Sequence, residues 1–161
     1  MLGAKKETLG LYVLYALILA LPLAMGDSAS SLGLYQGCPL WHRLTYPFLH
    51  QNVFHAVVNL YVLWQCQNSV KAGFNLLVFY AIAVTYPFAA TTHIIGLSGL
   101  VYAYMGYIAP YVQRKLRYNL IICVYIGIGF LLPCMAVGVH IYCYVLGLLW
   151  GYLNAPLCRD E

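Results

Sequence analysis

A serine and a histidine lie inside two long apolar stretches of this chain and are its most informative residues. Ser98 stands in the run Gly96-Leu97-Ser98-Gly99 near the start of one stretch, and His140 lies close to the start of another. Polar and ionisable groups are costly inside a bilayer and usually mark a functional site there. A serine hydroxyl becomes a nucleophile when a nearby base removes its proton. The two residues therefore predict a nucleophile and its base within the membrane.

Further polar residues precede the serine in the sequence. His55 and Asn59 are four residues apart, so they share one face of a helix. His50 is five residues before His55 and points elsewhere, which places it in the preceding loop or the first turn. One interpretation is that these side chains only form hydrogen bonds between helices. Two on one face, at the depth of a serine and a second histidine, favour a site.

Small residues line one face of each stretch that carries a candidate catalytic group. They recur at helical spacing, as Gly99, Ala103 and Gly106 in the first stretch and as Gly147 and Gly151 in the second. Such stripes permit two helices to approach closely. His140 is seven residues before Gly147 and shares its face, so close packing would bring His140 to Ser98. Tyr102 is one turn after Ser98, on the same face.

The composition shows which elements must hold these residues. The chain has 161 residues, of which 63% are hydrophobic and 7% charged, with a mean hydropathy of +0.79. A soluble domain of this size carries about 25% charged residues, so this is a multi-pass membrane protein. Six stretches are long enough to span a bilayer, at residues 9–26, 47–66, 73–91, 95–112, 118–136 and 138–156. We expect one all-α transmembrane domain over residues 1–161, with the first stretch retained as a helix.

The basic residues predict the orientation of the six spans. Seven of the eight fall on one side, namely Lys5, Lys6, Lys71, Arg114, Lys115, Arg117 and Arg159. Only Arg43 falls on the other side, so both termini are predicted to be cytoplasmic. The candidate site residues then lie near the outer surface, in the helices that enter from outside. The net charge reflects this topology, and the basic groove of a nucleic-acid-binding protein is missing.

Taken together, the motifs resemble those of the rhomboid intramembrane serine proteases of the basic six-helix type. The resemblance rests on three patterns, which are His50-x4-His55-x3-Asn59, Gly96-Leu97-Ser98-Gly99-x-Val101-Tyr102-Ala103-x-Met105-Gly106-Tyr107, and His140-x6-Gly147. They occur in the family's order and cover the transmembrane core. The resemblance implies a six-helix rhomboid-like bundle that hydrolyses peptide bonds.

The resemblance also implies a role for each residue. Ser98 would be the nucleophile and His140 the general base, while His55, Asn59 and the Ser98 backbone N–H would stabilise the oxyanion. Tyr102 would pack against the catalytic histidine. The other stabilising or supporting positions are His50, Gly96, Gly99 and Gly147. No Asp or Glu lies in a predicted span, so the sequence predicts a catalytic dyad.

Three departures from the family pattern affect the geometry and remove no catalytic group. The family often has Ala before the histidine and Gly three residues after it, where this chain has Val139 and Cys143. We expect their bulk to widen the helix contact slightly. The family's Trp-Arg pair in the first outward loop is replaced by Trp41-His42-Arg43. That loop, at about residues 27–46, has few charges and is expected to embed partly in the outer leaflet.

The expected partners are the lipid bilayer and single-span transmembrane proteins, which the resemblance implies are cut near the outer surface. Processing of C-terminal tails, as in rhombosortases, is a related option. Short loops suit a bacterial inner membrane, with the site opening to the outer side. No cofactor is expected.

A metal-dependent protease would need a motif such as H-E-x-x-H, which is missing. A non-catalytic relative need not keep both Ser98 and His140, and a transporter would need acidic residues in its spans and an inverted repeat.

Overall fold

The computed structural model describes residues 13, 15–21, 23–69, 76–88, 93–131 and 135–155, and this part of the chain is helical. Helical residues at 15–21 and 23–25 are followed by η1 (Gly26–Leu32), α2 (Leu40–Thr45), η2 (Tyr46–Phe48), α3 (Val53–Ser69), α4 (Leu76–Val84), α5 (Ser98–Ile108), η3 (Ala109–Tyr111), α6 (Lys115–Gly129) and α7 (Val137–Asn154). The described residues contain no strand, and their β pairing is one isolated antiparallel bridge between Leu34 and Ile94. The all-α prediction is confirmed for this part of the chain.

Each predicted span contains a helix, although several of the helices are shorter than the spans. The helices α5 and α6 have 11 and 15 residues. Among the described residues, α7 is the one helix whose length and apolar composition suffice to cross a membrane. Four of the basic residues that carry the orientation argument lie outside the described residues, namely Lys5, Lys6, Lys71 and Arg159. The span count and orientation therefore stay predictions.

The chain divides into two compact units, and residues 89–97 belong to the first of them together with residues 1–61. Leu34 and Ile94 exchange two backbone hydrogen bonds of 2.8 and 2.9 Å. The Gly96 N–H donates to the Tyr46 carbonyl at 3.0 Å. A Cβ on Gly33 would lie 2.7 Å from Ile95 Cγ2, so only glycine permits this approach. These contacts fix the backbone of the segment that leads into the serine motif.

The segment between the first two predicted spans is organised around His42, which lies in α2 and is buried. Its Nδ1 donates to the Gly33 carbonyl at 2.8 Å, because a carbonyl can only accept. The Trp41 ring lies 4.0 Å from the His42 ring, and the Tyr35 ring lies 5.7 Å from it. His93 in turn packs on Tyr35 at 4.6 Å. The displaced arginine of this loop, Arg43, is thus preceded by a histidine that holds the loop together.

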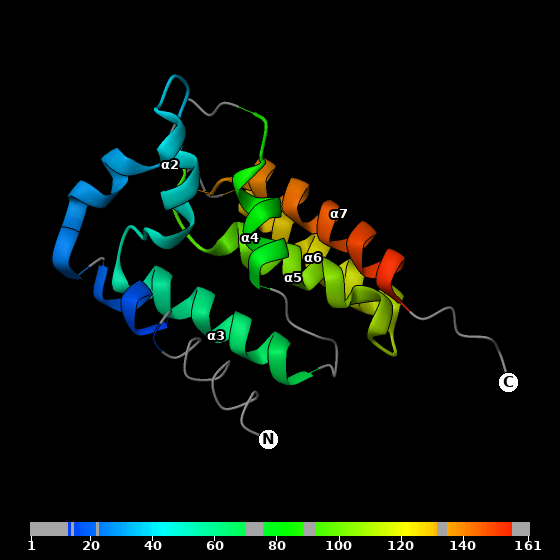
Figure 1. Ribbon diagram of the computed structural model, residues 1–161. Helices are drawn as coiled ribbons and strands as arrows, with labels where there is room; N and C mark the ends of the chain where they lie inside the picture. The colour runs from blue at the N-terminus through cyan, green and yellow to red at the C-terminus, as the bar shows by residue number, and fades with distance from the viewer. Residues whose placement is uncertain are drawn as a thin grey trace, which may run out of the picture. The chain divides into compact units, whose positions relative to one another are not determined.

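The second unit contains residues 62–88 and 98–161, and its helices α4, α5, α6 and α7 pack side by side (Figure 1). The closest approach is between α5 and α7. Three glycines lie directly against carbonyl oxygens of the opposing helix. A Cβ added to Gly106, Gly147 or Gly151 would overlap the carbonyl oxygen of Tyr144, Ala103 or Tyr107, respectively. Backbone therefore touches backbone along this contact, and the predicted close packing of the two glycine-bearing helices is confirmed.

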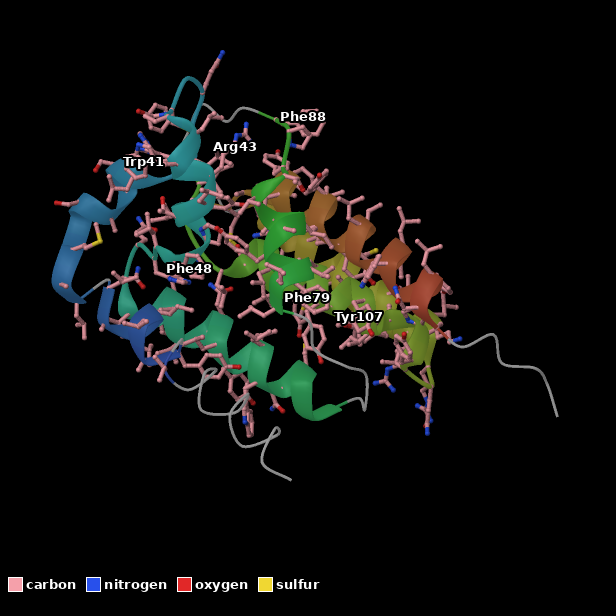
Figure 2. The ribbon with its side chains drawn as sticks, viewed as in Figure 1. Trp41, Arg43, Phe48, Phe79, Phe88 and Tyr107 are labelled. Carbon is pink, nitrogen blue, oxygen red and sulfur yellow. The ribbon has the colours of Figure 1, made fainter. Side chains whose placement is uncertain are left out.

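Aromatic and hydroxyl side chains complete the packing of the second unit. The Phe79 ring of α4 faces the Tyr107 ring of α5, with 5.4 Å between their centroids (Figure 2). The Tyr118 hydroxyl of α6 donates to the Met105 carbonyl of α5 at 2.9 Å. A hydrogen bond from the Tyr144 hydroxyl to Asn119 joins α7 to α6. These contacts join α4 and α6 to the C-terminal part of α5 and join α6 to the middle of α7.

Candidate active site

The serine and the histidine singled out by the sequence meet in the second unit. Ser98 is the first residue of α5, and His140 lies in the first turns of α7. Ser98 Oγ and His140 Nε2 are 2.9 Å apart, which is hydrogen-bonding distance. His140 is buried, with 3% of its surface exposed, whereas Ser98 is half-buried. A hydroxyl that contacts an imidazole nitrogen in this way has the geometry of a nucleophile and its base.

The imidazole plane is held by an aromatic ring of the opposing helix. The Tyr102 ring stacks on the His140 ring with 4.4 Å between centroids and 20° between planes. Tyr102 is four residues after Ser98, so one face of α5 supplies both the hydroxyl and the stacked ring. The chain's four acidic residues all lie outside α3 to α7. Ring packing therefore orients the histidine in place of the carboxylate that a Ser-His-Asp triad would use.

The two bulkier residues beside His140 pack against Gly99. A Cβ on Gly99 would lie 3.1 Å from Val139 Cγ1 and 3.4 Å from Cys143 Sγ. Cys143 is fully buried, as is Val139. Val139 and Cys143 are bulkier than the Ala and Gly of the family pattern. Their side chains pack where Gly99 has no side chain of its own.

His50 belongs to the first unit and lies before α3, in the loop where the sequence placed it. Its side chain is completely buried. The Leu97 N–H donates to His50 Nε2 at 3.2 Å, so this nitrogen must carry a lone pair and the ring is neutral. Leu97 is joined by a peptide bond to Ser98. His50 therefore fixes the backbone of the residue that precedes the candidate nucleophile.

His55 and Asn59 share a face of α3, as the four-residue spacing predicted. Asn59 Nδ2 donates to the His55 carbonyl at 3.0 Å, one turn earlier in the helix. An amide carries two N–H groups, so this bond leaves Asn59 a second donor. Asn59 is buried, and the His55 ring is half-buried.

The His55 ring packs directly on Gly96, two residues before Ser98 in the chain. A Cβ on Gly96 would lie 2.9 Å from His55 Cε1. The φ of Gly96 is +128°, a conformation that other residues rarely adopt. Both the turn and the neighbouring ring therefore require glycine at this position of the serine motif.

Asn52 is a residue that the sequence reasoning missed. Its side-chain Oδ1 accepts a hydrogen bond of 2.8 Å from the backbone N–H of His55. Asn immediately before a helix is the usual signal of an N-cap, and Asn52 directly precedes α3. That signal was present in the sequence beside the histidines.

Comparison with known proteins agrees with the motifs. A model of the Rhomboid domain matches residues 37–157. The chain is also 27% identical, over 147 residues, to the rhomboid protease GlpG of Haemophilus influenzae, and the alignment covers 78% of this chain and 76% of that protein. Rhomboid proteases are multi-pass membrane proteins that act on transmembrane substrates within the bilayer. Because the matched range includes the whole of α3 to α7, this chain belongs to the rhomboid family and is an intramembrane serine protease.

Proposed function

We propose that this protease cleaves single-span transmembrane proteins near the outer membrane surface, with Ser98 as nucleophile and His140 as general base. The observation that carries the proposal is the 2.9 Å contact between Ser98 Oγ and His140 Nε2, with Tyr102 stacked on the imidazole. The family membership supports a serine-dependent reaction. No cofactor or metal takes part in the proposed mechanism.

The reaction proceeds in two steps through an acyl-enzyme. His140 Nε2 removes the proton of Ser98 Oγ as this oxygen attacks the substrate carbonyl carbon. The tetrahedral intermediate collapses, His140 gives the proton to the leaving amine, and the C–N bond breaks. Water, deprotonated by His140, then attacks the ester and releases the second product, which restores the serine hydroxyl.

Neutral donors stabilise the oxyanion of each tetrahedral intermediate in this proposal. They are the Ser98 backbone N–H, the second N–H of Asn59 and an imidazole N–H of His55. Support comes from the family resemblance, from the free donor capacity of the Asn59 amide and from the contact of His55 with Gly96 of the serine motif. His50 has a supporting role, because it holds the Leu97 N–H.

The proposed topology has six spans, both termini in the cytoplasm and the site open to the outer side. It is supported by the split of seven basic residues to one. The whole of residues 1–161 would form one catalytic domain in a bacterial inner membrane, which fits the bacterial relative. Exposed apolar side chains support a lipid environment, such as those of Leu40, Trp41 and Leu44 in α2, which are 80%, 48% and 53% exposed.

Cleavage of a tagged reporter tests the function and the orientation together. The reporter is a single-span protein with one tag on each side of the membrane, expressed with the wild type, Ser98→Ala or Ser31→Ala. Ser31 is an exposed serine of η1 and serves as the matched control. We expect cleavage by the wild type and Ser31→Ala and none by Ser98→Ala. Mass spectrometry should place the cut after a small residue near the outer end of the reporter's span. A cut in the cytoplasmic half, or cleavage by Ser98→Ala, would contradict the proposal.

The oxyanion assignment predicts a change in kcat. Asn59→Ala should lower kcat roughly a hundredfold and leave KM nearly unchanged, because the lost donor acts on charge that develops in the transition state. Asn154→Ala is the matched control, since the Asn154 amide makes the same bond to a carbonyl four residues earlier, at 2.7 Å to Trp150. Steady-state cleavage of a fluorogenic substrate by both variants checks this. If Asn59→Ala and Asn154→Ala lowered kcat by the same small factor, Asn59 would have only a structural role and the oxyanion assignment would be wrong.

A further inference from the structure

We propose that Asn52 is a positioning residue for His55, because it caps α3 through the backbone N–H of that same histidine. The inference rests on the proposed function, in which His55 helps to stabilise the oxyanion, and it adds the residue that sets where His55 lies. Every contact used below lies within the first unit of the chain.

Both oxygens of Asn52 take part in starting α3. The first N–H groups of a helix have no partner within the helix. Asn52 Oδ1 accepts from the His55 N–H at 2.8 Å, and the Asn52 carbonyl accepts from the Ala56 N–H at 3.2 Å. A side-chain acceptor at this position stabilises the first turn and fixes its backbone. The side-chain cap therefore acts on the main chain of His55 itself.

The His55 ring fits into a space bounded on two sides. On one side a Cβ on Gly96 would lie 2.9 Å from His55 Cε1, so the ring rests on the glycine backbone. On another side the His50 ring stands edge-on, 5.1 Å away at 74°. These neighbours are themselves fixed, since Gly96 N–H donates to Tyr46 and His50 accepts from Leu97. A shift of the first turn would therefore move the imidazole relative to surroundings that do not follow it.

Asn52 can be altered without disturbing the core. Its side chain is exposed, in contrast to the buried ring of His50 and the half-buried ring of His55. Truncation to alanine removes the capping oxygen and leaves no cavity. A displacement of about 1 Å in a group that acts on the transition state is enough to slow a reaction strongly. Loss of the cap should consequently appear in kcat.

The first test compares variants at positions 51 and 52. Asn52→Ala should lower kcat on the order of tenfold with KM unchanged. Asn52→Ser and Asn52→Asp keep a side-chain acceptor for the His55 N–H and should restore most of kcat. Gln51→Ala truncates the exposed neighbouring side chain and should behave as wild type. Wild-type kcat in Asn52→Ala would overturn the inference, as would a failure of both Asn52→Ser and Asn52→Asp to recover kcat.

The second test asks whether Asn52 acts through His55. In a His55→Ala background, Asn52→Ala should cause no further fall in kcat, although it should lower the melting temperature as it does in the wild type. A tenfold fall in both backgrounds would mean a general loss of structure and would overturn the inference while leaving the proposed function intact. Wild-type kcat in the His55→Ala single variant would overturn the role of His55, and with it this inference.

Discussion

Removal of His140 should abolish the reactivity of Ser98. In His140→Ala the serine hydroxyl loses the base 2.9 Å away and is a poor nucleophile at neutral pH. We expect no labelling of Ser98 by a fluorophosphonate and a fall in kcat/KM of about 10⁴-fold or more. The double variant Ser98→Ala, His140→Ala should be little worse than either single variant, because residues that act as a unit have non-additive effects.

The labelling experiment needs a histidine control and a test of folding. His93→Ala removes an exposed histidine that packs on Tyr35 and should keep full labelling. Thermal melting of each detergent-purified variant shows whether the helices remain packed. Strong labelling of a folded His140→Ala protein would rule out His140 as the base. Equally weak labelling of His93→Ala would show that the assay responds to any lost histidine.

Substitution of Gly147 should have the largest effect on stability. Any Cβ at this position would overlap the Ala103 carbonyl of α5, and backbone atoms cannot move aside as a flexible side chain can. Gly147→Leu must force α5 and α7 apart, and we expect a loss of about 4 kcal/mol or more. In a protein of this size that lowers the melting temperature by roughly 10 °C. Activity should fall as well, because the same two helices carry Ser98 and His140.

Gly127 provides the matched control for this prediction. It lies within α6, and a Cβ built on it would meet nothing within 4 Å. Gly127→Ala should be neutral or stabilise the protein by about 0.5 kcal/mol, since alanine favours the helix over the unfolded chain. Melting of both variants in the same detergent checks the pair. A wild-type melting temperature for Gly147→Leu would contradict the close packing of α5 against α7.

The contact between Ser98 and His140 was predictable because its signals are local and periodic. The stripes around Gly106 and Gly147 follow helical spacing, and polar groups in apolar stretches are conspicuous. The same spacing placed Tyr102 on the face of Ser98. Two helices that must pack through glycines leave few ways to arrange the residues they carry, so the contact of Ser98 with His140 followed from the pattern.

The surroundings of the pair were less predictable because they depend on contacts between distant segments. Nothing periodic links Leu34 to Ile94 or His50 to Leu97, yet these hydrogen bonds fix the segment before Ser98. The positive φ of Gly96 depends on the same loop contacts. The helix α5 also covers only part of the apolar stretch at residues 95–112 that predicted it, since hydropathy reports burial in lipid or protein and does not locate helix ends.

The position of Ser98 at the very start of α5 has an electrostatic consequence. The peptide dipoles of a helix add up to a partial positive charge at its N-terminus, where the first N–H groups point outward. In the proposed mechanism, the negative charge on the substrate oxygen would develop at that end. A field supplied by the main chain needs no ionised side chain, which would be costly to keep charged within a bilayer. The protease could in this way stabilise an anion in the membrane while all of its own catalytic groups stay neutral in the resting state.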